Sequence, residues 1–306
     1  MLDPHELYQL ADEVPTLDRP VLVLALSGFV DAGGAARLTR EHLLATRDSQ
    51  PIATFDIDQL LDYRSRRPVM LFVEDHWESY DAPELQLLLL KDAADTPFLL
   101  LAGPEPDLQW ERFTAAVRAL IERFDVRLTI SFNAIPMAVP HTRPIGVTAH
   151  ATRPDLITGH RPWLQRVQVP GSVSHLLEFQ LGQAGRDAVG FAVHVPHYLA
   201  QTDYPDAAEV LLESVVGSTG LRLPTDELRS AAAAVRTEID EQVGQSDEVA
   251  AVVRALEEQY DAFVRGREQT NLLHEGDGRL PTAEELGAEL ERFLADQTDR
   301  RDQPGP

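Results

Sequence analysis

The chain has 306 residues, of which 43% are hydrophobic and 25% charged, and this composition favours a folded globular protein over a disordered one. It holds 27 Lys and Arg against 50 Asp and Glu, so the formal net charge is −23, which disfavours nucleic-acid binding because that mode needs basic groups to neutralise phosphates. The absence of cysteine excludes disulfides, thiol catalysis, thiolate zinc sites and iron–sulfur clusters.

The N-terminal residues predict no export signal. Residues 1–12 are polar and acidic, and they lack the basic and apolar regions of a signal peptide. The most apolar runs, at 85–90 and 98–102, are far shorter than the ~20 residues of a transmembrane helix. We therefore expect a cytoplasmic protein without a membrane span.

Strand-length apolar runs alternate with helical patterns through the first two thirds of the chain. The first run, Val21–Leu26, leads into a helical pattern that reaches Leu44. Further runs lie at 52–55, 69–73, 98–101, 126–132, 145–149 and 188–195, and helical patterns at 110–124 and 173–181. The alternation predicts a layered α/β fold with a central sheet. Because the runs 85–90 and 98–101 are too close together for a crossover helix, we expect a mixed sheet with an antiparallel part.

The character of the sequence changes near Leu221, after which no strand-like run appears. Thr225 and Ser246 are the expected caps of two helices, and the break at 244–246 predicts an antiparallel helical hairpin with an apolar seam. A capping box at 282–285 predicts a final helix through Leu294. The predicted organisation is an α/β core domain over 1–220, an acidic helical region over 221–297 and a disordered tail over 298–306.

A glycine-rich loop, Ser27–Gly34, lies where the first strand leads to a helix, and backbone amides at such a place can hold an anion. Gly28 and Gly33 have the spacing of a phosphate-binding P-loop, but Gly34-Ala35 replaces its Lys and hydroxyl residue. Two interpretations remain open. One is an anion site that includes Gly28, Asp31 and Gly33; the other is that the glycines permit a tight turn and close helix packing.

Residues 139–170 are locally basic, with four arginines and three histidines but one acidic residue, Asp155. Such a segment can bind a phosphate or carboxylate ligand, or it can receive an acidic face of another subunit. Its element Pro140–Pro144 fixes His141 and Arg143 between two prolines, which suits either a ligand site or a structural kink with an ion pair.

His194 and His197 follow a strand-like run, at the end where α/β folds bind ligands. The metal-binding H-E-x-x-H spacing is absent, and no serine lies in a G-x-S-x-G elbow. We therefore assign no metal, no cofactor and no catalytic residue. A ligand site, where one exists, is expected to take a phosphate-like or carboxylate anion, with its residues drawn from the set Gly28, Asp31, Gly33, His141, Arg143 and His197.

A series of short motifs follows one order along the chain. They are Gly28-Phe29-Val30-Asp31-Ala32-Gly33, Asp62-Tyr63-Arg64 with Arg67-Pro68, Gly103-Pro104-Glu105-Pro106-Asp107 with Trp110, Pro140-His141-Thr142-Arg143-Pro144, Pro170-Gly171-Ser172, and Val195-Pro196-His197-Tyr198 with Tyr204-Pro205. In this order they resemble the bacterial branch of the proteasome assembly chaperone family, second type, and the acidic helical tail resembles that of its actinobacterial members.

The resemblance implies a three-layer α/β/α domain similar to the phosphorylase and hydrolase fold, assembled into homo-oligomers such as trimers. It implies a non-enzymatic protein-binding or assembly factor with a further protein as its partner. The alternative is a small-molecule binder or enzyme of phosphorylase-like fold that takes a phosphate- or nucleoside-type anion. We predict a homo-oligomer, most simply a trimer, because the basic segment 139–170 needs an acidic counterpart.

Overall fold

The computed structural model describes residues 2–28, 30–160 and 166–275. The chain divides into two units, Met1–Leu256 and Glu257–Pro306. The final helix predicted from residue 282 and the tail predicted over 298–306 lie outside the described residues.

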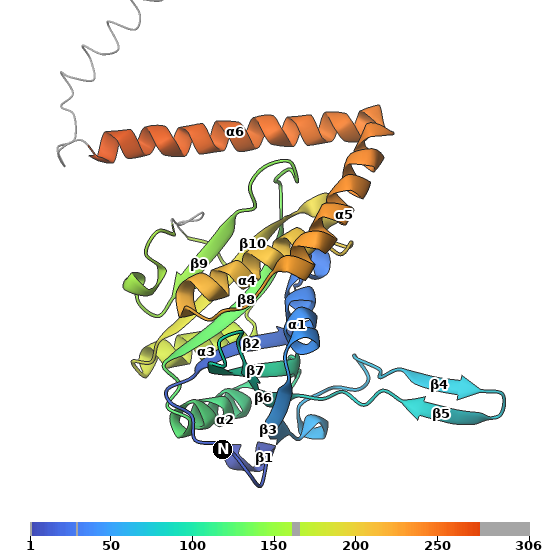
Figure 1. Cartoon of the computed structure of the whole chain (residues 1–306), viewed down its shortest axis with the longest axis vertical. Coiled ribbons are helices and arrows are strands. Elements are labelled where there is room, and N and C mark those ends of the chain that lie inside the picture. Colours follow the sequence, from blue (N-terminus) through green and yellow to red (C-terminus); the bar gives the residue numbers. More distant parts are fainter. Residues whose placement is uncertain (1, 29, 161–165, 276–306) are drawn as a thin grey trace, which may run out of the picture. The chain divides into compact units, whose positions relative to one another are not determined.

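A mixed eight-stranded sheet forms the centre of the first unit (Figure 1). The strand order is β1-β3-β6-β7-β2-β8-β10-β9. Strands β7, β2, β8 and β10 run parallel, whereas β6 pairs antiparallel with both β3 and β7, as the short link between their apolar runs predicts. The bounds are β1 (Tyr8–Leu10), β2 (Val21–Ser27), β3 (Ser49–Phe55), β6 (Gln86–Lys91), β7 (Pro97–Pro104), β8 (Leu128–Met137), β9 (Val147–Ala151) and β10 (Ala188–Pro196).

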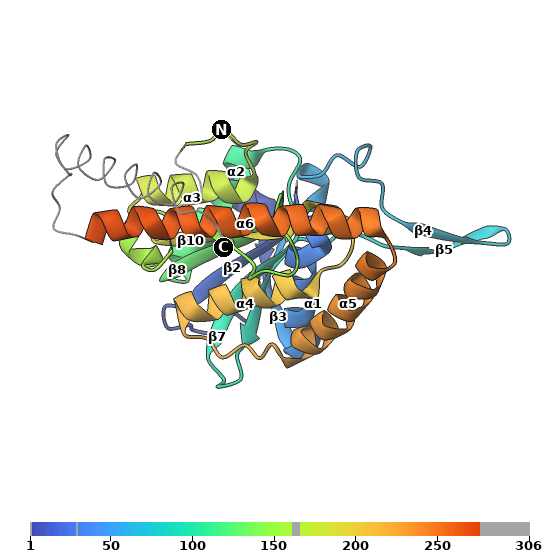
Figure 2. The same ribbon diagram turned by 90° about the horizontal axis from the view of Figure 1, so that it is seen from above.

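Helices cover both faces of this sheet, which gives three layers (Figure 2). Helices α1 (Ala35–Thr46) and α4 (Pro205–Thr219) share one hydrophobic core with alternate strand residues such as Val21 and Val23. Helices α2 (Trp110–Arg123) and α3 (Val173–Gln183) share the other core with the intervening residues, such as Leu22 and Leu24. Successive strand side chains point to opposite faces, so nearly continuous apolar runs are what a sheet buried on both sides requires. The predicted α/β/α fold is confirmed.

Two helices follow the core, as predicted. Helix α5 (Asp226–Gly244) packs on α4, and α6 (Asp247–Glu275) begins after the expected break. Leu228, Ile239 and Leu256, all placed on the predicted seams, are buried. The antiparallel packing of α5 against α6 stays a prediction. No helix within the described ranges has both the length and the hydropathy of a membrane span.

The strand predicted at 69–73 lies outside the central sheet. β4 (Met70–Val73) pairs with β5 (His76–Tyr80) in a two-stranded hairpin that extends away from the rest of the first unit (Figure 1). We call residues Val69–Asp81 the arm.

Candidate functional site

The winding of the sheet reverses between β2 and β7. β7 leads to α2 on one face and β2 leads to α1 on the other, so the carboxyl ends of these neighbouring parallel strands diverge. Open α/β sheets bind ligands at such points. A cavity of about 570 Å³ lies here, and we call it the switch-point crevice; its lining is Ser27, Gly28, Arg66, Glu105, Pro106, Asp107, Trp110 and Gly171.

Glu105, at the end of β7, is buried and caps helix α3. Its Oε1 accepts a 2.6 Å hydrogen bond from the backbone N–H of Val173, the first residue of α3, where the helix dipole favours a carboxylate. A Cβ placed on Gly28 would lie 2.5 Å from Glu105 Oε2. Because Gly28 has no side chain, the carboxylate of Glu105 can occupy this space.

Asp107 and Trp110 also line the crevice, and both are held by neighbouring groups. Asp107 Oδ1 pairs with the Arg66 guanidinium at 2.8 Å, and Oδ2 accepts from the Asp62 N–H at 2.9 Å. The Trp110 indole N–H donates to the Pro106 carbonyl at 2.6 Å. These bonds fix the shape of the crevice and tie it to the segment that leads into the arm.

The Asp31 carboxylate of the glycine-rich loop already accepts hydrogen bonds from the amides at the start of α1. Asp31 Oδ1 accepts from the Ala36 N–H at 2.7 Å and Oδ2 from the Arg37 N–H at 2.9 Å, at the first turn of α1. An external anion at these amides has to displace that carboxylate. Gly33 has a φ of 65°, and a Cβ there would lie 2.8 Å from the Tyr204 Cβ. These contacts favour the close-packing interpretation of the glycines, and an anion site stays a prediction.

The two histidines assigned to the ligand site meet at Tyr198. The Tyr198 hydroxyl accepts from the His141 backbone N–H at 2.9 Å and lies 2.6 Å from His141 Nδ1, while His141 Nε2 lies 3.3 Å from Asp240 Oδ1 of α5. The exposed His197 sets its ring edge-on to Tyr198, with centroids 5.5 Å apart. Arg143 follows in the same turn as His141 and is half-buried.

The predicted residues therefore fall into two groups. Gly33 joins the histidine group, because its N–H donates to Ala200 at the end of the turn that begins at His197. Gly28 belongs instead to the switch-point crevice, beside Glu105. The sequence motif Gly103–Asp107 contained both crevice carboxylates, but nothing in the pattern assigned them the task of holding α3 and Arg66.

The basic segment 139–170 finds acidic partners in its own chain. The Arg153 guanidinium holds both carboxylate oxygens of Asp187, at 2.7 and 2.8 Å, and also pairs with Asp155. The hydrogen bond from Arg153 and its charge keep the pKa of Asp187 below its usual range. The acidic partner that the sequence analysis expected on another subunit thus lies within the same chain. The homo-oligomer stays a prediction, and this segment no longer supports it.

A histidine cluster that the sequence did not reveal lies between β9 and α3. His150 Nδ1 lies 2.8 Å from Glu178 Oε1, and the His150 and His175 rings meet edge to face at 5.7 Å. Burial, reinforced by His150, lowers the pKa of His175. Gly190 in β10 makes room for the His150 ring, which a Cβ would overlap. Among the described residues, no three His, Asp or Glu side chains are placed to hold a metal ion.

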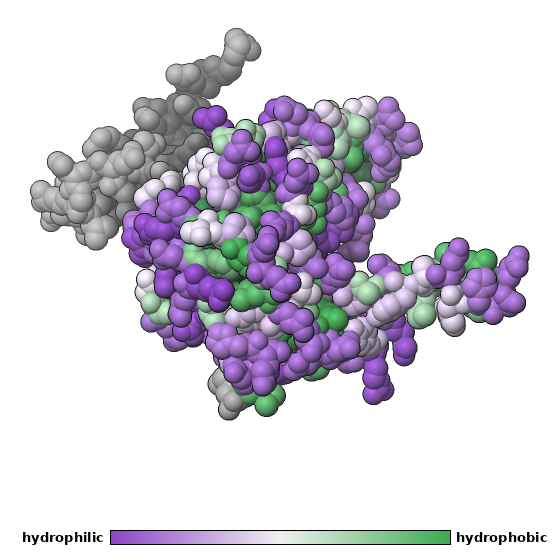
Figure 3. All heavy atoms as spheres, turned by 60° about the horizontal axis from the view of Figure 1, so that its bottom comes forward, coloured by the Kyte–Doolittle hydropathy of each residue, from purple (hydrophilic) through white to green (hydrophobic). Residues whose placement is uncertain are grey.

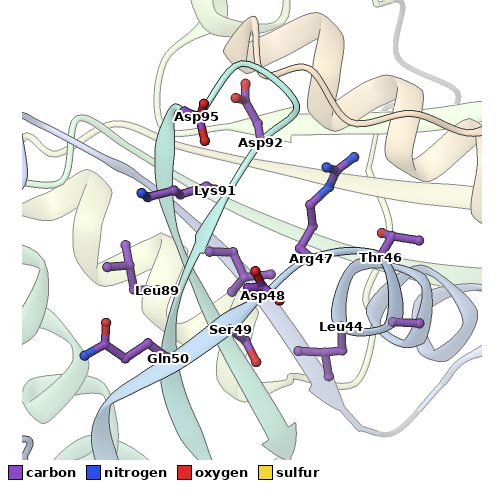
Figure 4. A pocket seen from close by; sticks show the side chains of 12 residues that line it. Leu44, Thr46, Arg47, Asp48, Ser49, Gln50, Leu89, Lys91, Asp92 and Asp95 are labelled. Atoms are coloured by element: carbon purple, nitrogen blue, oxygen red, sulfur yellow. The ribbon is translucent and has the colours of Figure 1, made fainter.

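A second cavity, of about 590 Å³, opens where α1 ends, β3 begins and β6 ends (Figure 4). Arg47, Asp48, Lys91, Asp92 and Asp95 are among its lining side chains. Asp92 accepts hydrogen bonds from the backbone N–H groups of Ala94, Thr96 and Arg222, so it shapes its own loop. This cavity lies at the amino end of β7, the edge where α/β sheets do not place their ligands, and we therefore take the switch-point crevice as the candidate site.

Comparisons with known proteins agree with this architecture. The model of the PAC2 family matches residues 25–243. A Mycobacterium tuberculosis protein of unknown function, Rv2714, is 55% identical, with 87% of this chain and 92% of that chain covered and a TM-score of 0.84. A Corynebacterium glutamicum protein of unknown function is 41% identical, covering 84% of this chain and 98% of that one at a TM-score of 0.81.

A third similar structure carries a functional description. The Mycobacterium tuberculosis proteasome-assembly chaperone homologue Rv2125 is 28% identical, covering 76% of this chain and 99% of that chain at a TM-score of 0.70. A search of curated proteins finds no match. The family model spans most of the chain and two of these relatives exceed 40% identity, so the resemblance found in the motifs is confirmed: the chain belongs to the PAC2 family.

Proposed function

We propose that this protein is a non-enzymatic protein-binding or assembly factor, similar in role to the proteasome assembly chaperones. The proposal rests on one observation: the carboxylates at the switch-point crevice bind other parts of the same chain. Glu105 holds the amide of Val173, and Asp107 holds Arg66 and the amide of Asp62. These groups bind and position parts of the chain itself.

A small-molecule enzyme needs polar groups aimed at its substrate, with an acid, base or nucleophile within hydrogen-bond reach of the reacting atoms. At the neighbouring glycine loop, both carboxylate oxygens of Asp31 accept from amides of α1. The polar groups at this edge of the sheet thus stabilise loops and helix ends. This role suits a protein that binds other proteins through its surface. Membership of the PAC2 family supports the same role.

Proteins are the proposed partners, beginning with a second copy of this chain. We propose a homo-oligomer, most simply a trimer, that acts in the cytoplasm. Subunits of the 20S proteasome are the partner class to test first, because the relative Rv2125 is described as a proteasome-assembly chaperone homologue.

The test is an assembly assay. Separately purified α- and β-subunits of a Mycobacterium tuberculosis 20S proteasome are mixed with and without this protein, and complete particles are followed by native electrophoresis and peptidase activity. The proposal predicts a complex between this protein and a subunit and faster appearance of complete particles. An unchanged rate without any such complex would remove the proteasome from the proposed role.

The alternative, an anion-binding protein or enzyme, is favoured by one feature: the exposed His197 beside the Tyr198 and His141 pair. Isothermal titration with phosphate, nucleosides and nucleotides tests it. Binding that Arg143→Ala abolishes would support this alternative, whereas the assembly-factor proposal predicts no heat of binding from any of these compounds.

A further inference from the structure

One wall of the switch-point crevice carries a carboxylate oxygen without a hydrogen-bond partner. Glu105 is only 6% exposed, and its Oε1 accepts from the Val173 N–H. No described residue donates to its Oε2, which lies 2.5 Å from the position that a Cβ on Gly28 would take. Glu105 and Gly28 both line the crevice, and Oε2 is not enclosed by protein. A buried carboxylate with one acceptor free at a cavity is suited to receive a hydrogen-bond donor.

The half-buried Trp110 adds an aromatic surface to the same crevice. Its indole N–H donates to the Pro106 carbonyl at 2.6 Å, and this bond fixes the ring. A Cβ on Gly171 would lie 4.0 Å from Cζ3 of that ring, so the absence of a side chain there keeps space beside the indole. The face of a tryptophan attracts a cation that comes within about 6 Å of the ring centre.

The charged side chains of the crevice favour a cationic ligand. The charge of Asp107 is paired with that of Arg66, at 2.8 Å. Glu105 forms no ion pair with a basic side chain among the described residues, and the amide end of α3 is its polar neighbour. An anion at this wall would meet the negative charge of Glu105, whereas a cationic donor would form a charge-assisted hydrogen bond with it.

Exposed apolar side chains flank the crevice. Leu108 follows Asp107 and is 49% exposed, and Val169, two residues before Gly171, is 64% exposed. Hydrophilic side chains predominate on the face of the chain drawn in Figure 3, and apolar ones are interspersed among them. A protein segment suits this surroundings when it carries apolar side chains beside its basic group. The net charge of −23 attracts such a basic segment from a distance.

A guanidinium uses both features of the crevice at once. Its planar face stacks on an indole while its edge donates to a carboxylate, which an ammonium group does not combine in the same way. We propose that the switch-point crevice receives an arginine side chain of a partner protein, with the guanidinium donating to Glu105 Oε2 and stacked on Trp110. This inference rests on the protein-binding function proposed above and names a chemical group that the partner supplies.

Fluorine NMR of the full-length protein, labelled with 5-fluorotryptophan, tests the contact, because the chain has only three tryptophans. The variant Trp110→Phe identifies the Trp110 signal. The probes are the capped peptide Gly-Leu-Arg-Leu-Gly and the same peptide with citrulline, a neutral residue of nearly the same shape, in place of arginine. The proposal predicts that the arginine peptide shifts the Trp110 signal and leaves that of Trp77, on the arm, in place. The citrulline peptide should shift neither.

The variant Glu105→Gln separates the charge of this side chain from its role as a helix cap. Glutamine keeps a carbonyl oxygen for the Val173 N–H but replaces Oε2 with an amide N–H₂, so the affinity for the arginine peptide should fall at least tenfold. Glu111→Gln is the matched control, because it removes a carboxylate of α2 that does not line the crevice, and it should change the affinity less than twofold. Gly171→Leu, which fills the space beside Trp110 and leaves Glu105 unchanged, should also cost at least tenfold. Circular dichroism spectra establish that each variant folds.

The other outcomes separate this contact from the protein-binding function itself. Equal binding of the arginine and citrulline peptides, or an unchanged affinity in Glu105→Gln, would overturn the proposal. Agmatine that binds as tightly as the arginine peptide would identify a free guanidinium compound as the ligand and would also overturn it. A Trp110 signal that stays in place at millimolar arginine peptide would overturn the contact but leave the protein-binding function standing if the wild type forms a complex with a proteasome subunit. The absence of both the shift and that complex would remove both proposals.

Discussion

One buried histidine sets a pH limit on the stability of the fold. His194 in β10 has no exposed surface, its Nε2 lies 2.8 Å from Thr148 Oγ1, and burial lowers its pKa to about 4. Between pH 6.5 and 4 the unfolded chain binds a proton that the folded chain excludes, so the free energy of unfolding falls as the pH falls. The contribution over this window is about 3 kcal/mol.

Replacing His194 with Gln removes this contribution. Urea unfolding at pH 7 and pH 4.5 should show a smaller loss of stability for His194→Gln than for the wild type, although the variant starts from a lower value at pH 7. The exposed His5 provides the control, because His5→Gln should keep the wild-type pH dependence. An identical slope in His194→Gln would show that other groups cause the acid sensitivity.

Gly103 is the position where one added methyl group should do the most damage. Its φ of 144° is unfavourable for other residues, and the overlapping atom is a backbone oxygen that cannot rotate away. Gly103→Ala should cost ~3 kcal/mol in chemical denaturation. Gly217→Ala is the control: this helical glycine of α4 has open space around it, so alanine should be neutral or slightly stabilising.

What single residues do was the hardest part to predict from the sequence. The motifs drew attention to Asp31 and Glu105, whose partners differ in their distance along the chain. Asp31 has its partners five and six residues away, whereas Glu105 reaches an amide 68 residues along the chain, in a segment that only folding brings near. A sequence pattern does not show such distant contacts. The motif that contains Glu105 could therefore be recognised, but its role in capping α3 could not be predicted.

At the scale of elements, an ion pair ties α5 to the core. Asp206 of α4 is buried, Oδ1 pairs with Arg236 of α5, and burial raises the pKa of Asp206 against the opposing effect of that arginine. Arg236→Ala should cost about 2 kcal/mol, because it leaves a buried carboxylate without its partner. The double variant with Asp206→Asn should recover part of that loss.

Arg37, which pairs with the exposed carboxylates of Glu41 and Asp203, is the control. Arg37→Ala should cost less than ~1 kcal/mol, as exposed ion pairs do. Equal losses at Arg37 and Arg236 in thermal or chemical unfolding would mean that burial of Asp206 does not matter.

Elements were predictable where their pattern depends on local spacing. The runs that became β2, β7 and β10 are apolar along nearly their whole length, and the short link before β7 correctly indicated an antiparallel neighbour. Helix α4 was not predicted, because it is buried on most sides and shows no clear polar face. β5 was also not predicted: the run His76–Tyr80 is mostly polar and pairs only with β4.

For the whole molecule, the proposed homo-oligomer has to join copies of an acidic chain. The chain carries a net charge of −23, which opposes association of its copies, so apolar burial has to supply the attraction. Higher salt should therefore strengthen the oligomer, because it screens the general repulsion more than it weakens an apolar contact. Sedimentation at 50 mM and 500 mM NaCl measures this effect, and dissociation at high salt would indicate an interface dominated by ion pairs.

The most direct test of the central claim is the molar mass of the protein in solution. Size-exclusion chromatography with light scattering, from 1 to 100 μM, should give the mass of an oligomer, most simply a trimer. A protein that stays monomeric over this range would contradict the proposed homo-oligomer.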